Sequence, residues 1–490
     1  SADDLGPFTN PTLRLAQDIG DRLAAAHEKG LYAKRLDHHR DTYMWLDAYR
    51  LLERNLGEER RARWRRALVE NLTPLAAEVA RRQDYPWYNS PYIGTSPNHY
   101  SLWSSTLHLG GRVFGNAEWE KLGARVMHRF AAEEQTADGY WGEHSRAGPT
   151  TGYDYLTSTG VALHWEHSRD AAALEALRRS TDFHKYFTYP DGTPVEVIND
   201  RNRYWAPSMW GHFGFSHFPD GRRYAEFLAG FYPKELSLES MGRIAQSALY
   251  YHDGETAPIP QDQPRYNHQM RVPAGIRKSG PWVICLSGII DTQTLSRFYL
   301  DRQGHLSVFH EKLGLIVTGA NSKRQPELAT FLERMGERVF HLPISSRLQM
   351  SDETDRLSFA YNTFFSVLEA TTAEGEVLLR FRISPRGRLA EAQLNLQLVL
   401  KPGQTIEMGS GRKAAIESAR LELGPEALGG WIVHNGWRLH VPPGARLEWP
   451  VYPHNPYADA PETDLARAVA VVATPLRAGI AEIVFRLQAP

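Results

Sequence analysis

The hydrophobic pattern changes once along this chain of 490 residues, close to residue 251. Before that point apolar residues recur at intervals of three and four, as in the stripe from Trp119 to Phe130. That period is typical of helices that bury one face. After it the pattern alternates, which is typical of strands. Because the two patterns occupy separate halves, we expect an α+β protein with a helical domain followed by a β domain.

Residues 1–251 are predicted to form roughly ten helices, the last of which begins near Leu236. Short connections rich in Gly, Pro and Asn separate them, such as Phe114–Asn116 and Tyr189–Gly192. Helices joined by such short connections pack as antiparallel hairpins. The first half therefore predicts an array of helical hairpins.

Residues 252–281 contain five prolines and three glycines, and we expect them to be a linker. From residue 282 to residue 490 the alternating runs are separated by turns and no helical pattern lies between them. Many strands without helices between them favour antiparallel sheets stacked as a sandwich. The clearest runs are Leu306–Phe309, Leu313–Val317, Val377–Ile383, Ala392–Leu400 and Ala481–Leu487.

The composition excludes several classes of function. The 56 basic and 57 acidic residues nearly cancel, so no overall charge attracts nucleic acid or an anionic membrane. Cys285 is the only cysteine, which excludes an intrachain disulfide and a zinc–thiolate cluster. No apolar run reaches the ~18 residues of a membrane-spanning helix. The chain begins at Ser1, which fits a cleaved export signal as well as trimming, and we expect a secreted or periplasmic protein of undetermined oligomeric state.

The segment Ala137–Leu156 holds one histidine, three tyrosines and three acidic residues between glycines. Glycine and proline at that density indicate a shaped loop, and it leads into a helical pattern. Rigid scaffolds commonly present catalytic groups on such loops. Asn98 lies 46 positions before His144, in a second polar cluster at Pro97–Tyr100. The two clusters predict an active site for an acidic sugar.

Tryptophans add to this interpretation, because nine of the thirteen fall in the helical half. Trp87, Trp141 and Trp205 lie on loops or helix starts, where an aromatic face could stack on a sugar ring. Trp64 and Trp119 stand at helical spacing among aliphatic residues and are expected in the core.

The order of the polar residues resembles the catalytic signature of the acidic-polysaccharide lyases. These are the hyaluronate and chondroitin AC lyases and their alginate and heparinase II/III-type relatives. Their signature is an asparagine, an Asp-Gly segment with a histidine about fifty residues later, a tyrosine nine residues on, and then an arginine. The matching positions here are Asn98, Asp138–Gly139, His144, Tyr153 after Thr151–Gly152, and Arg201 or Arg203. Asn98–His99 also resembles the Asn-His pair of the alginate and heparinase-type relatives.

The resemblance implies an (α/α) toroid of about five helical pairs over residues 1–251 and an antiparallel β-sandwich over 282–490. It also implies cleavage of a uronic-acid polysaccharide by β-elimination, in a cleft closed on one side by the sandwich. No cofactor is expected, although some relatives carry a structural divalent cation in the sandwich. The chain is shorter than the hyaluronate lyases, and Pro97–Tyr100 replaces their Asn-Trp-Trp segment. The polymer, and cleavage from its ends or its middle, therefore stay open.

Elimination explains why these residue types are needed. Removing the C5 proton next to a carboxylate creates a second negative charge, which Asn98 with His99 or His144 would stabilise. Tyr153 would act as base and acid in a syn elimination, with its pKa of ~10 lowered by Arg201 or Arg203. In an anti elimination His144 would be the base and Tyr153 the acid.

Residues flanking this catalytic set are predicted to bind the substrate. They are His99, Tyr100, Trp87, Trp141, Glu143, Tyr155, Arg203, Tyr204 and Trp205.

Each catalytic residue has a structural alternative. Asn98 could cap the helix that follows it, and His144 could be bonded to backbone. Tyr153 could pack locally, and the arginines could pair with Glu196 and Asp200.

Two other functions remain open, and so does the presence of a bound metal ion. A glycoside hydrolase on the same scaffold would use two carboxylates from Glu143, Asp154, Glu196 and Asp200. A glycan-binding protein would need only the tryptophans and arginines. Candidate metal ligands are His38–His39 or, in the sandwich, His268, His310 and His341, without tight ligand spacing.

Overall fold

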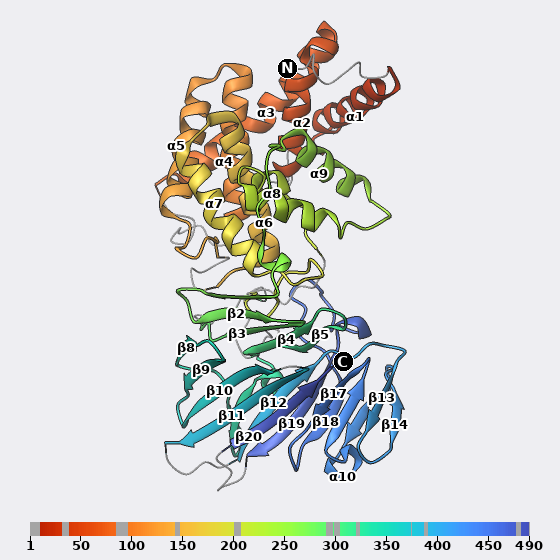
Figure 1. The fold of residues 1–490 in the computed structure, drawn as a ribbon. Helices are drawn as coiled ribbons and strands as arrows, with labels where there is room; N and C mark the ends of the chain where they lie inside the picture. The colour runs from red at the N-terminus through yellow and green to blue at the C-terminus, as the bar shows by residue number, and fades with distance from the viewer. Residues whose placement is uncertain are drawn as a thin grey trace.

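The computed structural model describes residues 10–31, 39–84, 97–142, 148–199, 207–290, 297, 304–319, 324–373, 375–386, 391–476 and 482–489. A helical part forms one end of the molecule and two β-sheets form the other (Figure 1). None of the helices in the described ranges is long and apolar enough to cross a membrane. The predicted fold class, a helical toroid followed by an antiparallel sandwich, is confirmed.

The helical part ends close to the predicted boundary. Its last helix begins at Leu238, where the Ser237 side chain accepts a hydrogen bond from the backbone N–H of Ser240. The predicted turn before α5 is also present, with the Asn116 side chain accepting from two backbone N–H groups of that helix. The helices are α1 (Asn10–Glu28), α2 (His39–Leu52), α3 (Glu58–Arg82), α4 (Pro97–Phe114), α5 (Ala117–Glu133), α6 (Thr151–Ser168), α7 (Ala171–Tyr186), α8 (Pro219–Ala229) and α9 (Leu238–Leu249), with a 3-10 turn η4 (His212–Gly214) before α8.

The helices form two layers of neighbours. In one layer α4 packs between α2 and α6, and in the other α5 packs against α3 and α7. Glycines allow the layers to approach closely: a Cβ on Gly123 of α5 would lie 2.6 Å from the backbone nitrogen of His108 in α4. Because α4 has neighbours on several sides, most of its residues are buried.

The prediction that residues 252–281 form a linker is wrong for the second half of this segment. Two strands, β1 (Arg265–Gln269) and β2 (Ala274–Ser279), lie within it and pair with each other. Pro264 and Pro273 precede these strands instead of interrupting them, so they remove no hydrogen bond from the ladder. The strands are short and prolines surround them, and β2 is buried along nearly its whole length, so it shows no alternating pattern.

The strands form two antiparallel sheets. One has the order β1-β2-β3-β4-β5-β12-β19-β18-β15 with β6 and β7 beside β12, and the other has the order β14-β13-β16-β17-β20-β11-β10-β9-β8. The five runs singled out in the sequence correspond to β4, β5, β11, β12 and β20. The bounds are β3 (Trp282–Ser287), β4 (Leu306–His310), β5 (Gly314–Thr318), β6 (Phe331–Met335), β7 (Arg338–Phe340), β8 (Ser345–Met350), β9 (Thr354–Ala360), β10 (Phe364–Ala373), β11 (Glu376–Pro385), β12 (Glu391–Leu398), β13 (Thr405–Met408), β14 (Lys413–Ala415), β15 (Leu421–Leu423), β16 (Trp431–His434), β17 (Trp437–His440), β18 (Arg446–Val451), β19 (Val469–Leu476) and β20 (Glu482–Gln488), with a short helix α10 (Pro425–Leu428).

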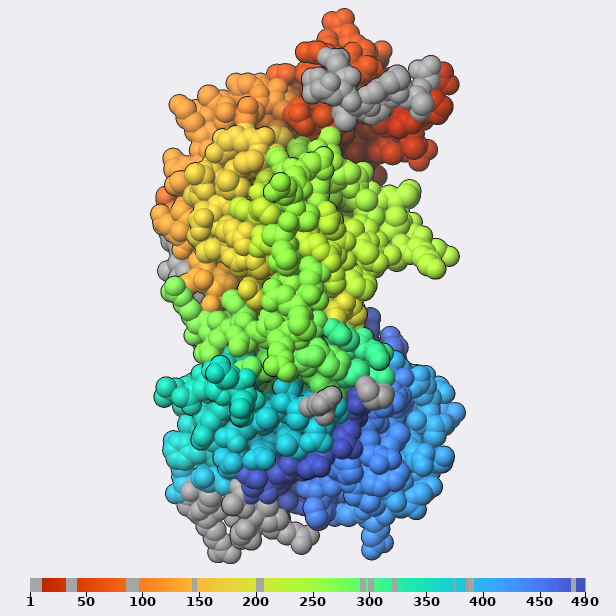
Figure 2. Space-filling model, in the orientation of Figure 1, coloured from red at the N-terminus to blue at the C-terminus, as the bar shows by residue number. Residues whose placement is uncertain are grey.

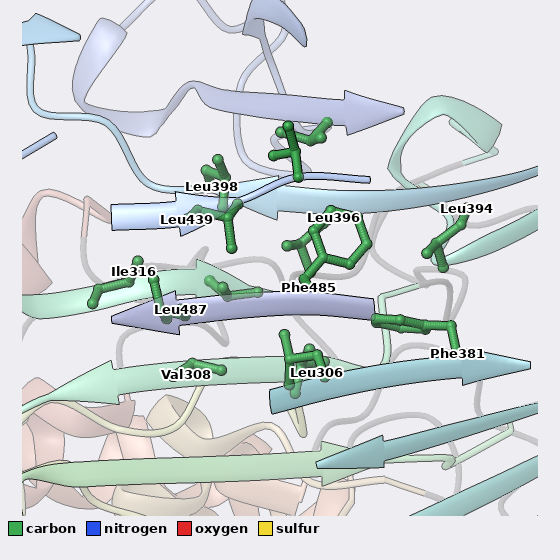
Figure 3. Close-up of a cluster of buried hydrophobic side chains, with 14 of the residues drawn as sticks. Leu306, Val308, Ile316, Phe381, Leu394, Leu396, Leu398, Leu439, Phe485 and Leu487 are labelled. Carbon is green, nitrogen blue, oxygen red and sulfur yellow. The ribbon is translucent and has the colours of Figure 1, made fainter. Parts of the chain in front are cut away.

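The inner faces of the two sheets share one hydrophobic core (Figure 3). Leu396 of β12 belongs to one sheet, Phe381 of β11 and Phe485 of β20 belong to the other, and all three are buried. Alternate residues of β20 face this core while those between them are exposed, which is the pattern of a strand with one buried face.

The helical part and the sandwich share a packed interface. The ring of Tyr189, which follows α7, stacks on Phe309 of β4 with centroids 4.7 Å apart. The Tyr189 hydroxyl lies 2.7 Å from the hydroxyl of Ser307 and donates to Glu196 at 2.9 Å. In Figure 2 the outline of the molecule is indented on one side between the segment joining α8 to α9 and the sandwich.

Candidate active site

Helices α4 and α6 run side by side in the same direction. Gly160 in the middle of α6 lies against Ser101 in the second turn of α4, where an added Cβ would come within 2.6 Å of the serine hydroxyl. Further along both helices the rings of His108 and His164 lie 5.0 Å apart. Because residue numbers increase together in the two contacts, the helices are parallel and their N-termini lie at the same end.

That shared end carries two of the predicted catalytic residues. With a rise of about 1.5 Å per residue, Asn98 lies about 4.5 Å and Tyr153 about 10.5 Å along the axes from the Ser101–Gly160 contact. Neighbouring helices have axes about 8–10 Å apart, which separates the two positions by roughly 10–12 Å when they are measured on the helix axes. The two residues therefore lie at the same end of the helical layer.

The same end faces the sandwich. The ring of Tyr153 lies 6.4 Å from the ring of Tyr457, which belongs to the segment between β18 and β19. Gln325 donates to the carbonyl of Tyr452 at 2.9 Å and accepts from the backbone of His454 at 2.8 Å, so it holds this segment in place. Gln325 and residues of the 452–462 segment line a cavity of about 510 Å³. Sequence reasoning missed Tyr457, although an aromatic residue in a Pro- and Asn-rich turn was a visible signal.

Asn98 lies within the first turn of α4, which begins at Pro97. The structural alternative, in which Asn98 caps this helix, stays open, because a helix end is defined only to within one or two residues. Its side chain is 1% exposed, and its backbone carbonyl accepts from the Ser101 hydroxyl at 3.2 Å. Asn98 is thus a buried residue at the N-terminal end of α4.

His99 is partly exposed on the same turn, and its ring stacks on Trp103 at 5.8 Å. The guanidinium of Arg82 lies 5.7 Å from the centroid of the same tryptophan. These contacts set the direction of the imidazole, and the predicted substrate-binding role of His99 stays a prediction.

Tyr100 and Trp141 were predicted to bind the substrate, but both are core residues. The Tyr100 side chain packs on Phe130, its hydroxyl accepts from Arg129 at 2.9 Å, and burial raises its pKa. The Trp141 ring is 1% exposed, stacks on Phe130 at 5.2 Å and donates to the Phe130 carbonyl. A ring enclosed in this way offers no face to a sugar, so neither residue fits the expected substrate-binding role.

The predicted substrate-binding role of Tyr155 is also wrong, because this residue is 1% exposed. Its ring stacks on His184 at 3.9 Å, and its hydroxyl lies 2.5 Å from the hydroxyl of Tyr224. Burial raises the pKa of Tyr155 to about 12, so the phenol stays neutral. The side chain supports the start of α6 and has no access to a polymer.

Two of the four carboxylates considered for a glycoside hydrolase lie within the described residues, and both are enclosed by protein. Asp154 is 1% exposed and accepts from the backbone N–H of Trp141 at 2.8 Å. Glu196 is 6% exposed, and its carboxylate accepts from the hydroxyls of Tyr189 and Thr318 at the domain interface. Burial raises the pKa of Glu196 to about 7. Neither carboxylate is presented to a glycan.

The remaining predicted site residues lie outside the described residues, and their roles stay predictions. They are Trp87, Glu143, His144, Asp200, Arg201, Arg203, Tyr204 and Trp205.

The histidines expected to hold a metal in the sandwich have packing roles. His268 stacks on Tyr186 at 4.2 Å, and His310 lies against Trp282 at 4.6 Å. In the part of the chain that the structure describes, neither these nor His341 belongs to a group of three metal-binding side chains. His38 and the side chain of His39 lie outside the described residues.

Comparisons with known proteins give similarities of structure alone. No family model matches the sequence, and no curated protein matches it. A chondroitinase AC lyase studied with bound oligosaccharides is similar with a TM-score of 0.48 and 12% identity, over 97% of this chain and 71% of the other. A variant of the Streptomyces coelicolor A3 chondroitin AC lyase is similar with a TM-score of 0.47 and 12% identity, over 91% and 66%. The alpha-N-acetylgalactosaminidase NagBb from Bifidobacterium bifidum has a TM-score of 0.28 and 11% identity, over 46% and 36%. Similarities at this level assign no activity to the chain.

Proposed function

We propose that this chain is a polysaccharide lyase that cleaves a uronic-acid-containing polysaccharide by β-elimination. The observation that carries the proposal is the parallel pairing of α4 and α6. It brings the amide of Asn98 and the phenol of Tyr153 to one end of the helical layer, opposite Tyr457 of the sandwich. Such polymers are found outside cells, so the activity would place the protein in a secreted or periplasmic location.

The amide of Asn98 suits the first requirement of elimination, which is to stabilise charge on the sugar carboxylate. An N–H donor held by a rigid helix needs no reorganisation when the enolate-like intermediate forms. One well-placed donor of this kind lowers the barrier by about 3–4 kcal/mol. Asn98 is 1% exposed in this structure, so the proposed role requires the chain that covers it to move aside before a sugar carboxylate can reach the amide.

The phenol of Tyr153 suits the second requirement, which is proton transfer. It would take the C5 proton and return a proton to the oxygen leaving C4, and general acid–base catalysis contributes on the order of 10² to 10⁴ in rate. Tyr153 is partly exposed, unlike the enclosed Tyr155 two positions later. The elimination therefore uses the tyrosine that can reach a polymer.

A glycoside hydrolase is the alternative on this scaffold, and it needs two accessible carboxylates. Asp154 and Glu196 are both enclosed by protein partners and are not available for hydrolysis, whereas the other two candidates, Glu143 and Asp200, lie outside the described residues.

One assay separates the candidate functions. The protein is incubated with hyaluronan, chondroitin, alginate, heparin-like chains and glucuronan, and each sample is followed by ultraviolet absorbance and by reducing ends. A lyase produces both signals, because each cleavage leaves a C4–C5 unsaturated sugar. New reducing ends without absorbance would replace the proposal by hydrolysis. Polymer binding with neither signal would replace it by a non-catalytic binder.

A further inference from the structure

Three side chains that can bind a metal meet at the end of α6 that lies away from the candidate active site. They are Glu166 in the last turn of α6, His217 just before α8 and His252 just after α9. One ligand atom from each lies within 4.8 Å of the other two. Glu166 follows Tyr153 by thirteen residues of one helix, a distance of about 20 Å along its axis. This cluster is therefore separate from the elimination site.

The distances within the cluster are close to those of a metal site. The Nε2 atom of His252 lies 2.7 Å from Oε1 of Glu166, and Nε2 of His217 lies 3.6 Å from the same oxygen. Zinc binds imidazole nitrogen and carboxylate oxygen at about 2.0–2.2 Å in a tetrahedral arrangement, which separates the ligand atoms by roughly 3.3–3.6 Å. Small side-chain movements would bring all three atoms onto one ion.

His217 provides an independent indication that this cluster binds a ligand. Its side chain is 3% exposed, and its buried Nε2 has no hydrogen-bond partner although it points toward the Glu166 carboxylate. Buried polar atoms are almost always satisfied, so an unpartnered imidazole nitrogen needs an explanation. An imidazole nitrogen of this kind is a common metal ligand.

The surrounding charges leave Oε1 of Glu166 available as a ligand. Arg169 donates to the other carboxylate oxygen, Oε2, at 3.2 Å and lies 4.0 Å from the centroid of the Trp165 ring. Arg222 donates to the carbonyls of Ser216 and Glu255. Both guanidinium groups are held by these partners, and Arg169 fixes the orientation of the carboxylate in the way that outer-shell partners do at metal sites.

We propose that Glu166, His217 and His252 form a binding site for a zinc-class divalent cation. Two imidazoles and one carboxylate are a ligand set that zinc accepts, with water in the fourth position. The side chain of His252 is 35% exposed, which leaves one side of the site open to that water. The ion joins α6 to the segments around α8 and α9, and so stabilises the last part of the helical domain.

The test measures metal binding directly and does not depend on any enzymatic activity. The full-length protein is stripped with EDTA, dialysed against Zn²⁺, and its bound zinc is measured by elemental mass spectrometry. The variants are Glu166→Gln, His252→Ala and His217→Ala. His128→Ala is the matched control, because His128 is an exposed histidine of the same helical part that pairs with Asp170.

We expect one zinc per chain in the wild type and in His128→Ala, and a loss of at least tenfold in zinc affinity in Glu166→Gln and His252→Ala. Added Zn²⁺ should raise the Tm of the wild type but not of these variants, because a ligand that binds only the folded state stabilises it. His252 is partly exposed, so His252→Ala should fold even if His217→Ala does not. Equal zinc content in wild type and His252→Ala, or no stoichiometric zinc in the wild type, would overturn the proposal.

Discussion

The carboxylate Oδ2 of Asp154 lies 2.9 Å from Nε2 of His184, inside the helical domain. The other carboxylate oxygen accepts from the backbone N–H of Trp141 at 2.8 Å. Asp154 thus connects the Gly-rich segment before α6 to helix α7. Because Tyr153 immediately precedes Asp154, the same contact fixes the turn of α6 that carries the proposed base.

Replacing Asp154 with Ala should destabilise the protein by about 2–5 kcal/mol, because it leaves the Trp141 N–H and the His184 ring without their buried partner. Urea unfolding checks the size of this loss. Glu175→Gln is the control, since its pair with Arg179 is exposed and should contribute less than about 0.5 kcal/mol. A loss in Asp154→Ala as small as that of the control would contradict a structural role for this contact.

Glu196 should make stability depend on pH. Its pKa is about 7 in the folded protein against an ordinary 4.5, so the folded state holds a proton that the unfolded chain has lost between these values. The stabilisation is fully present below about pH 4.5 and disappears as the pH rises through 7, a loss of up to about 3 kcal/mol. Glu196→Gln cannot ionise and should show a flatter profile. Urea unfolding at pH 5 and pH 7.5 measures how far the free energy of unfolding falls between these values. An equal fall in the wild type and in Glu196→Gln would show that Glu196 is not the responsible group.

Tyr153→Phe should lower kcat by about 10² to 10⁴ while leaving polymer binding nearly unchanged, because only proton transfer is lost. Tyr155→Phe is the matched control. It removes a hydroxyl bonded to Tyr224, which should reduce stability by about 1 kcal/mol and leave kcat close to that of the wild type. Steady-state kinetics and thermal unfolding of both variants test the pair. Retained turnover in Tyr153→Phe would remove this residue from the mechanism.

Asn98→Ala should lower kcat by about 10² to 10³, since the amide acts chiefly on the charge that develops in the transition state. Asn116→Ala serves for comparison, because Asn116 caps α5 and its loss should reduce stability by about 1 kcal/mol without affecting turnover. If the two asparagine variants lost turnover equally, the effect of Asn98 would be on folding and not on catalysis.

The fold class could be predicted because a helical period and a strand period are visible without tertiary information. The strands β1 and β2 were missed because prolines surround both of them. The roles of Trp141 and Tyr155 were misassigned for a different reason. A polar, Gly-rich segment shows which residues are near a site, but burial against Phe130 or His184 depends on helices that the segment itself does not reveal.

The sequence pattern also could not predict contacts between distant segments. His217 and His252 lie 51 and 86 positions after Glu166, a spacing that matches no metal-binding motif. Tyr457 reaches Tyr153 across the domain interface from more than 300 positions away. Asn98 and Tyr153 were assigned to one site from their spacing and from the resemblance to the lyases, and the parallel packing of α4 and α6 was not predicted.

The most direct test of elimination is the mass of the products formed from a uronate polymer that the protein cleaves. Elimination breaks the bond without adding water, so each new non-reducing end carries a C4–C5 double bond and the oligosaccharide is lighter by one water than its hydrolytic counterpart. The proposed mechanism predicts that the wild type gives only these lighter products and that Tyr153→Phe gives almost none. Products at the full hydrated mass, formed by both proteins, would contradict it.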